Sequence, residues 1–572
     1  MKSLLKYLKP YKKLLIIGPF FKLMEAILEL MLPFLMSKVI DIGVANQDKG
    51  YVLRMGGIML LTAAIGVCCA LICQYSASLV SQGVGTDIRN AMFAHIGTLS
   101  NSELDQIGTS SLINRITNDV NQVQAAVAML IRLVIRAPFL CVGGLVMAFI
   151  IDPKMSLILV IVLPVFILIL SFTMTKTIPL YKMVQKKLDR IALVLRENLS
   201  GVRVIRAFSK TRYEKERFAV PNHEYEVNAV RVGRISALLN PLTNLVMNFS
   251  IGAILWYGGL RVYDGVTSAG DIIAFIGYVT QILAALIVIS NLVVIFTKAF
   301  ASAARVAEVM AMEPGITDGA GYTEGRHSDI AVEFRDVSMT YNKGGEYDIA
   351  GISFRVKRGQ TIGIIGGTGS GKSTLVNMIP RFYDTSAGQV LVDGVDVRDY
   401  PMDVLRSKIG VVQQKTVLFT GTIEENIRWG KKDAADEEVR RAADIAQASE
   451  FIDRLPDGYK TMISRGGVNV SGGQRQRLTI ARALVKQPDI LILDDSFNAL
   501  DFATDAALRK AIRGYTRDMT TFIVSQRAST IRSADQILVL NEGILAGIGT
   551  HEELMDTCGV YREICESQMQ NQ

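Results

Sequence analysis

The sequence predicts a membrane domain built of α-helices, followed by an α/β domain. Three observations predict this division. Of the 572 residues, 50% are apolar and the mean hydropathy is +0.30, which is high for a wholly soluble chain. Long apolar segments fill the first half, whereas short β-type runs alternate with helical stretches after residue 330. A glycine-rich stretch near residue 370 joins a strand-like run to a helical one.

Six apolar segments are each long enough to cross the hydrocarbon core of a lipid bilayer. They are residues 14–39, 56–79, 134–151, 155–174, 245–263 and 272–296. The basic N-terminus leads into the first of them without a small-residue cleavage site, so we expect an uncleaved first span. We expect a multi-pass protein of the plasma membrane.

The distribution of Lys and Arg predicts which side of the membrane each loop faces. Residues 175–234 carry many more Lys and Arg than acids, which is typical of a cytoplasmic stretch. Both termini then face the cytoplasm, and the short connections 41–54, 152–154 and 264–271 face outward. Such loops also account for the net charge of +8, so the charge does not require nucleic acid as a partner.

Charged residues in the membrane region, most of them near the ends of the apolar segments, are costly unless they face water or one another. They are Lys22, Glu25, Glu29, Arg132, Arg136 and Lys298. For the four basic residues we expect positions at the membrane surface or in the cytoplasm rather than contact with cargo. Glu25 and Glu29 share one helical face, and two hypotheses stay open for them: they line a cavity that favours cationic cargo, or they pair with Lys or Arg.

The apolar segments are followed by helical patterns that continue well beyond a bilayer, in residues 81–132 and 175–244. We expect their tips, near 103–114 and 207–212, to contact the second domain. The sequence Glu313-Pro314-Gly315 then breaks the helical pattern. We therefore predict a transmembrane domain over 1–312, a linker over 313–329 and a nucleotide-binding domain over 330–572.

The glycine-rich stretch has the spacing G-x-x-x-x-G-K-S, which is typical of a phosphate-binding loop. Glycines let backbone N–H groups turn toward a phosphate, Lys372 can neutralise phosphate oxygens, and Ser373 can hold Mg²⁺. The alternative, a glycine-rich turn that matches by chance, is disfavoured by the strand-like run before it and the helical run after it. The predicted cofactors are ATP and Mg²⁺. The candidate binding residues are Gly366, Thr368, Gly369, Ser370, Gly371, Lys372, Ser373 and Thr374.

A second motif lies in residues 470–484, where Ser471, Gly472, Gly473 and Gln474 open a helix and offer free N–H groups to an anion. This motif resembles the signature of ABC transporters. Together with the phosphate loop and the six spans ahead of it, the chain resembles one half of an ABC exporter over essentially its whole length. A soluble ABC ATPase that acts on nucleic acid would not carry six spans.

The resemblance implies roles for further residues. Tyr341 takes the place of the aromatic ring that stacks on adenine, although a core tyrosine is the alternative. Gln414 takes the place of the glutamine that reaches Mg²⁺ and the attacking water, with Gln413 as an alternative one residue away. Asp494 ends a buried strand and would hold Mg²⁺ through water. Asp501 belongs to a loop that resembles the one communicating across the ATPase dimer.

Two positions depart from the family pattern, and both concern hydrolysis. Asp495 stands where the family has a glutamate base, and Gln526 stands where it has a histidine that contacts the γ-phosphate. A third departure, residues 464–467 just before the signature, concerns domain coupling. The first two imply that this chain's own ATP site is slow, while its intact signature serves a partner.

The resemblance therefore implies the degenerate-site half of a heterodimeric exporter of small amphipathic compounds. Export of lipid or peptide is the alternative for the cargo, and a mainly regulatory ATP-binding subunit is the alternative for the function.

Overall fold

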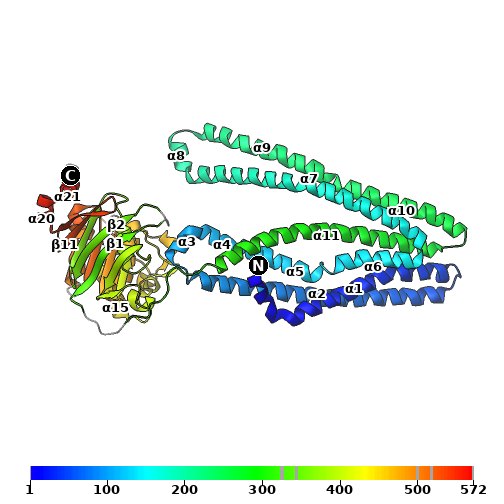
Figure 1. Ribbon diagram of the computed structural model, residues 1–572, viewed down its shortest axis with the longest axis horizontal. Helices are drawn as coiled ribbons and strands as arrows, with labels where there is room; N and C mark the ends of the chain where they lie inside the picture. Colours follow the sequence, from blue (N-terminus) through cyan, green and yellow to red (C-terminus); the bar gives the residue numbers. More distant parts are fainter. Residues whose placement is uncertain (1, 323–327, 342–344, 498–501, 516–518, 570–572) are drawn as a thin grey trace. The chain divides into compact units, whose positions relative to one another are not determined.

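The computed structural model describes residues 2–322, 328–341, 345–497, 502–515 and 519–569. By their internal contacts the residues form two compact units (Figure 1). One unit comprises Met1–Gly97 and Thr109–Ala311, and the other comprises Thr98–Gly108 and Met312–Gln572. The predicted fold class is confirmed, because the regular elements described in the first unit are helices and the second unit is an α/β domain.

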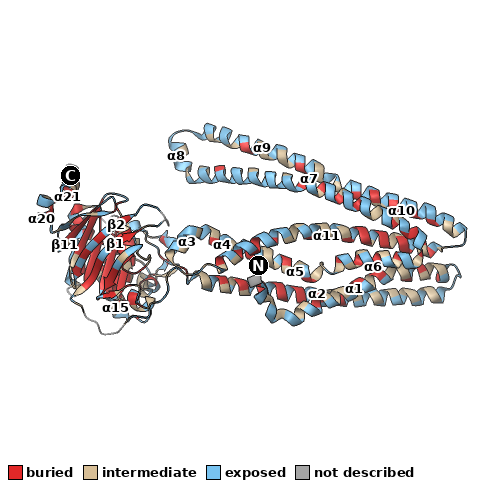
Figure 2. Cartoon of the chain, in the orientation of Figure 1, coloured by how far each residue is buried: buried red, intermediate tan, exposed pale blue. Residues whose placement is uncertain are grey.

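The membrane unit consists of long helices joined by short turns. Its described elements are η1 (Lys2–Tyr11), α1 (Lys12–Lys38), η2 (Val39–Val44), α2 (Lys49–Ile96), α4 (Thr109–Asn114), η3 (Arg115–Asp119), α5 (Val120–Arg132), α6 (Arg136–Ile151), α7 (Pro153–Ser200), α8 (Val202–Ala207), α9 (Thr211–Ala237), α10 (Leu239–Tyr263) and α11 (Ala269–Met310). Helices α7 and α9 pack along each other, and Figure 2 shows that most of their residues in this region are exposed.

Five helical stretches of the described chain are long and apolar enough to cross a membrane. They are Lys49–Ile96, Thr109–Ile151, Pro153–Ser200, Thr211–Tyr263 and Ala269–Met310. Helix α1 has 27 residues and is therefore about 40 Å long, which suffices for a sixth span. Helix α1 is not among these five stretches because of its charge and not because of its length: Lys22, Glu25 and Glu29 interrupt its apolar sequence.

The charges of α1 form a compact cluster with a residue of α6. Lys22 Nζ lies 2.7 Å from Glu25 Oε2, and Arg136 Nη2 lies 2.7 Å from Glu29 Oε2. Arg136 Nε also lies 4.0 Å from Glu25 Oε1. Two cations and two anions therefore neutralise one another. Of the two hypotheses for Glu25 and Glu29, the structure shows pairing, and Lys22 and Arg136 are their partners.

Ion pairs also fix the ends of the helices far from the apolar segments. The carboxylate of Asp119 in η3 is completely buried and pairs with Arg305 of α11. One turn away, Arg115 Nη1 lies 2.9 Å from Glu308 Oε2. These contacts hold α11 against η3 and α5, so the helices extend beyond their apolar segments as a packed bundle.

The second unit is built on two larger β-sheets. One has the strand order β2 (Ile349–Lys357), β1 (Ile330–Met339), β4 (Ala387–Val392), β5 (Val395–Asp396). The other has the order β12 (Ile544–Gly549), β11 (Gln536–Asn541), β3 (Thr361–Gly366), β10 (Thr520–Val524), β9 (Ile490–Asp494), β6 (Ile409–Val412). A two-stranded sheet pairs β7 (Gly421–Thr422) with β8 (Met462–Ile463). Figure 2 shows that the strands carry the buried core of this unit.

The second sheet determines where a site can form. Strands β6, β9, β10, β3 and β11 run parallel, and among the described strands of this sheet only the edge strand β12 is antiparallel. The carboxyl ends of parallel strands meet at one edge of a sheet, where the following loops build the binding sites of α/β proteins. The loops that follow β3, β9 and β10 therefore share one edge.

Helices cover and connect these strands. They are α3 (Asn101–Ile107), α12 (Lys372–Asn377), α13 (Met402–Ser407), α14 (Ile423–Arg428), α15 (Asp436–Ile445), α16 (Ser449–Ile452), η4 (Gly458–Lys460), η5 (Arg465–Gly467), α17 (Gly472–Leu484), α18 (Phe502–Tyr515), α19 (Ala528–Ile531), α20 (His551–Thr557) and α21 (Gly559–Met569). Between α3 and α4, Gly108 has a φ of +79°, a backbone conformation that favours glycine and ends the helix there.

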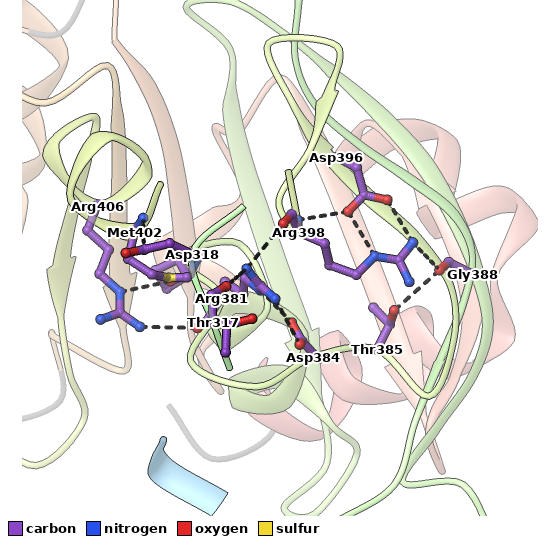
Figure 3. A network of polar contacts seen from close by, with 11 residues as sticks. Thr317, Asp318, Arg381, Asp384, Thr385, Gly388, Asp396, Arg398, Met402 and Arg406 are labelled. Carbon is purple, nitrogen blue, oxygen red and sulfur yellow. Dashed lines mark hydrogen bonds and ion pairs between the residues drawn. The ribbon is translucent and has the colours of Figure 1, made fainter. Parts of the chain in front are cut away.

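Part of the segment expected as a linker (313–329) is attached to the α/β unit by hydrogen bonds (Figure 3). The buried Arg381 donates from Nη1 to the carbonyl oxygen of Thr317 over 2.9 Å. Asp318 Oδ1 accepts from the backbone N–H of Met402 over 2.9 Å. The start of this segment is therefore attached to the rest of the α/β unit and is not a free linker.

Candidate nucleotide-binding site

A cavity of about 330 Å³ lies at the shared edge of the parallel sheet. Such a volume is within the range of small-molecule and cofactor pockets. The loop 368–374 after β3 lines it, together with Asp494 at the end of β9, Asp495 and Gln526. Gln414, which follows β6, completes this group of predicted residues. The structure thus brings residues from four separated segments into one cavity.

The phosphate loop takes its shape from glycines in left-handed conformations. The φ angles are +83° at Gly369 and +91° at Gly371, the residue that precedes α12. A Cβ atom at Gly371 would lie 2.5 Å from Ile349 Cγ2, so a side chain at this position would collide with β2. The loop therefore needs glycine both for its backbone conformation and for its close approach to the neighbouring strand.

Lys372 lies inside the loop. Its Nζ donates to the carbonyl oxygens of Gly366 over 3.0 Å and Gly367 over 2.6 Å, and to Ser370 Oγ over 3.4 Å. Burial lowers the pKa of Lys372, and the nearby Asp495 and Asp494 partly oppose this shift. In the described chain Lys372 has no carboxylate within ion-pair distance. An anion in the cavity would supply the missing countercharge.

Ser373 and Asp494 form the second pair of the cavity. Ser373 Oγ donates to Asp494 Oδ1 over 3.1 Å. Burial raises the pKa of Asp494 from 3.8, and the hydrogen bond from Ser373 opposes this shift. A hydroxyl beside a buried carboxylate is an oxygen-only donor set, which suits a hard cation such as Mg²⁺. The residues present therefore fit Mg²⁺ bound together with a phosphate.

Asp495 and Gln526, the two residues that depart from the family pattern, both line the cavity. Asp495 Oδ2 accepts a hydrogen bond from Gln414 Nε2 over 3.3 Å, whereas Asp495 Oδ1 is buried and has no hydrogen-bond partner among the described residues. The side chain of Gln526 is exposed at the rim, and its backbone carbonyl accepts from Gln568 Nε2 over 2.7 Å. Of the two adjacent glutamines, Gln414 lines the cavity.

Tyr341 lies beside the phosphate loop, outside the residues that line the cavity. Its hydroxyl donates to Thr374 Oγ1 over 3.1 Å, and 45% of the residue is exposed. Burial of the phenol raises the pKa of Tyr341. The ring is therefore held at the first turn of α12 and is partly exposed rather than buried in the core.

Comparison with known proteins decides the family. The family pattern described as "ABC transporter transmembrane region" matches residues 15–286, and the pattern described as "ABC transporter" matches residues 349–498. The chain belongs to the ABC transporter family. The uncharacterised ABC transporter ATP-binding protein YfiB of Bacillus subtilis is 39% identical over 99% of this chain and 98% of its own length. The putative multidrug export ATP-binding/permease protein YgaD of the same bacterium is 33% identical over 99% of this chain and 98% of its own.

A solved structure agrees with this assignment. The structure of a bacterial Atm1-family ABC exporter with ATP bound matches with a TM-score of 0.79 and 25% sequence identity. The match covers 97% of this chain and 98% of the other. The chain is therefore an ATP-hydrolysing ABC transporter with the fused membrane and ATPase domains of an exporter.

The ABC signature is not part of the cavity. Ser471 caps α17: its Oγ accepts from the N–H of Gln474 over 3.2 Å, and Gln474 Oε1 accepts from the N–H of Ser471 over 2.9 Å. Ser471 and Gly472 are exposed, and Gly473 is partly exposed. The signature is thus folded and open to contact from outside the chain's own cavity. Asp501, the residue expected to communicate across the dimer, lies outside the described residues.

Sequence reasoning missed Tyr383. Its hydroxyl donates to Asp105 Oδ2 of α3 over 2.7 Å, and its ring meets Tyr341 edge-on with the centroids 5.0 Å apart. Burial, followed by the hydrogen bond to Asp105, raises the pKa of Tyr383. Helix α3, which is part of the first predicted contact tip, is therefore connected to Tyr341 through one side chain. Neither spacing nor periodicity marks Tyr383, because its partners lie 278 and about forty residues away.

Proposed function

We propose that this chain is the degenerate-site half of a heterodimeric ABC exporter. Its cavity binds ATP with Mg²⁺ but turns it over slowly, and its signature completes the faster site on the partner. The observation that carries this proposal is the position of Asp495 and Gln526, which both line the cavity. The two departures therefore fall where the chemistry of hydrolysis would take place.

In this proposal the residues that bind ATP and Mg²⁺ are all present. The N–H groups of the loop 368–374 and the ammonium of Lys372 hold the phosphates, and Tyr341 stacks on the adenine ring. Ser373, Asp494 and Gln414 hold Mg²⁺, which neutralises charge on the phosphate oxygens when it is bound. Each of these residues lies in or beside the cavity in the geometry described above.

The hydrolytic half is weakened at two positions. The carboxylate of Asp495 ends one methylene earlier than a glutamate would, so it holds the attacking water about an ångström too far from the phosphate. The amide of Gln526 is neutral and cannot carry the positive charge that an imidazole can, so it stabilises less charge in the transition state. Both changes lower the rate of hydrolysis and leave binding intact.

The signature serves the other site. Ser471 offers a hydroxyl, and the first turn of the 13-residue helix α17 offers N–H groups, to the γ-phosphate held by the partner. Their exposure in this chain supports the proposal, because a group that serves another chain must be accessible from outside.

We propose small amphipathic compounds as the cargo, and the plasma membrane as the location, with the ATPase domain in the cytoplasm. The relative YgaD is named a putative multidrug export protein, and this supports the proposed cargo. Lipid or peptide export is the rival for the cargo, and a regulatory ATP-binding subunit is the rival for the function.

Purification of the tagged chain from its native membrane tests the pairing. We expect a second ABC half-transporter to co-purify, and the pair to show vanadate-sensitive ATP hydrolysis that cargo stimulates. The chain purified alone should bind ATP with Mg²⁺ and hydrolyse it far more slowly than the pair. Hydrolysis by a homodimer of this chain at an ordinary transporter rate of about ten per second or more would refute the proposal. A pair that binds ATP but never shows cargo-stimulated turnover would favour the regulatory rival.

A further inference from the structure

A polar cavity of about 350 Å³ lies between α2 and α5 of the membrane unit. Side chains that carry amide or hydroxyl groups line it from both helices, namely Gln74, Ser78, Ser81 and Gln82 from α2 and Asn121 and Gln124 from α5. Arg132, the last residue of α5, lies at one end of it. No carboxylate is among the lining residues.

The positive charge at this cavity has no countercharge in the described chain. Arg132 makes no ion pair or hydrogen bond with any described residue, although its side chain is only partly exposed. A second arginine, Arg89, donates only to neutral acceptors: Asn121 Oδ1 over 2.6 Å and Gln124 Oε1 over 3.2 Å. Because the carboxamide oxygens accept from Arg89, the N–H groups of both amides remain as donors for another acceptor.

The same excess of positive charge holds for the charged residues in and next to the apolar segments as a group. Lys22, Glu25, Glu29 and Arg136 neutralise one another, as described above. The two that remain, Arg132 and Lys298, are both basic, and Lys298 is exposed without a partner among the described residues. The uncompensated charge along these segments is therefore positive, which disfavours a cation as cargo and favours an anion.

We propose that the cavity between α2 and α5 binds the acidic head of an amphipathic anion, a carboxylate, sulfonate or phosphate on an apolar tail. The inference rests on the proposed export function and specifies its class of substrate. Arg132 pairs with the acidic head, and the amide and hydroxyl groups donate to its remaining oxygens. The tail lies along the apolar surface next to the cavity, where Leu71 precedes Gln74 by about one turn and is 63% exposed.

Binding of the head also gives Arg132 the partner that it lacks. Arg132 lies two residues before the apolar segment 134–151, and its charge strengthens a complex with an anion and weakens one with a cation. A neutral amphiphile would gain only the contacts of its tail. The cavity is thus expected to discriminate by the charge of the head among ligands that have equal tails.

The test uses the purified transporter complex in phosphatidylcholine nanodiscs, with three probes of equal tail length below their micellar concentrations. The probes are dodecyl phosphate, dodecyltrimethylammonium and dodecyl maltoside. Binding is measured by calorimetry, and ATP hydrolysis is measured in parallel. We expect dodecyl phosphate to bind most tightly. Arg132→Gln should weaken its binding by about tenfold or more, and Arg132→Lys should restore most of the affinity, because it keeps the charge.

Arg196→Gln is the matched control, since Arg196 on α7 is exposed and has no partner among the described residues. This variant should bind dodecyl phosphate as the wild type does. Equal affinities for the three probes, or no effect of Arg132→Gln, would overturn the proposal. A loss of subunit association in Arg132→Gln, seen by size-exclusion chromatography, would instead make the cavity a subunit interface and would overturn the proposal too.

Two further experiments distinguish whether the acidic head belongs to a lipid or to a solute, and whether the ligand is exported. Competition by phosphatidylglycerol added to the nanodiscs would identify a lipid headgroup as the ligand, whereas its absence would identify a solute, and either result supports an acidic head. Failure of the exporter proposal would look different: dodecyl phosphate would bind through Arg132, yet ATP would not drive its accumulation in inside-out vesicles. ATP-driven accumulation of the cationic probe that Arg132→Gln leaves unchanged would overturn the anion proposal alone.

Discussion

Restoring the two altered residues should turn a slow ATP site into a fast one. The variant Asp495→Glu/Gln526→His adds one methylene to the carboxylate and supplies an imidazole at the rim of the cavity. Replacing Asp495 breaks few hydrogen bonds, because its Oδ1 has no partner among the described residues and its Oδ2 has one long hydrogen bond of 3.3 Å, from Gln414. A misplacement of about an ångström typically costs about a hundredfold in rate.

We therefore expect the restored chain, purified as a homodimer in which each copy's signature completes the other copy's site, to hydrolyse ATP about a hundred times faster than the wild-type homodimer. Asp495→Glu or Gln526→His alone should raise the rate of hydrolysis by less, because the carboxylate base and the imidazole that contacts the phosphate act on the same chemical step. Phosphate release from the protein in nanodiscs measures the rate. Asp495→Gln/Gln526→His is the control, since it has the added length but no carboxylate, and it should show no comparable gain. Equal rates for the wild-type and restored chains would refute the reasoning.

Three other predictions concern binding, coupling and the membrane helices. Lys372→Ala should weaken equilibrium binding of ATP with Mg²⁺ by at least about a hundredfold, because it removes the cation of the phosphate loop, and a change within twofold would contradict its role. Tyr383→Phe removes the bond to Asp105, so it should lower cargo-stimulated hydrolysis a few-fold at unchanged ATP affinity; a loss of affinity instead would make Tyr383 a binding residue. Arg136→Gln leaves Glu29 without its partner and should lower the free energy of unfolding by about 2 kcal/mol, seen as an earlier melting transition, while Glu29→Gln in the same chain should recover part of it.

Local sequence patterns predicted the elements that depend on local sequence. Each of these patterns depends only on residues that are neighbours in the sequence, as in the apolar segments, the glycine-rich loop and the β-type runs. The fold class that they predicted is confirmed. The sequence assigned Mg²⁺ binding both to the phosphate loop and to Asp494, and both line one cavity because β3 and β9 end at the same edge of the parallel sheet.

Contacts between residues far apart in the chain could not be predicted in the same way. The sequence showed that Glu29 needs a partner but not that Arg136, 107 residues later, provides it. Likewise, the bond between Tyr383 and Asp105 depends on how α3 packs within the second unit, far from its neighbours in the sequence, and neither residue has an unusual local sequence. The hydrogen bonds of the linker segment were missed for a related reason, since glycine and proline mark irregular backbone but do not distinguish a free segment from an anchored one.

The measurement that tests the central proposal most directly compares two variants of this chain within the purified heterodimer. Ser471→Ala removes a hydroxyl that serves the partner's site, whereas Asp495→Asn removes a carboxylate that serves this chain's own slow site. We expect Ser471→Ala to lower ATP hydrolysis by about a hundredfold, the usual effect of losing one well-placed donor in a transition state. Asp495→Asn should leave most of the hydrolysis. A heterodimer that keeps its rate with Ser471→Ala but loses it with Asp495→Asn would show that the working site belongs to this chain, and would contradict the proposal.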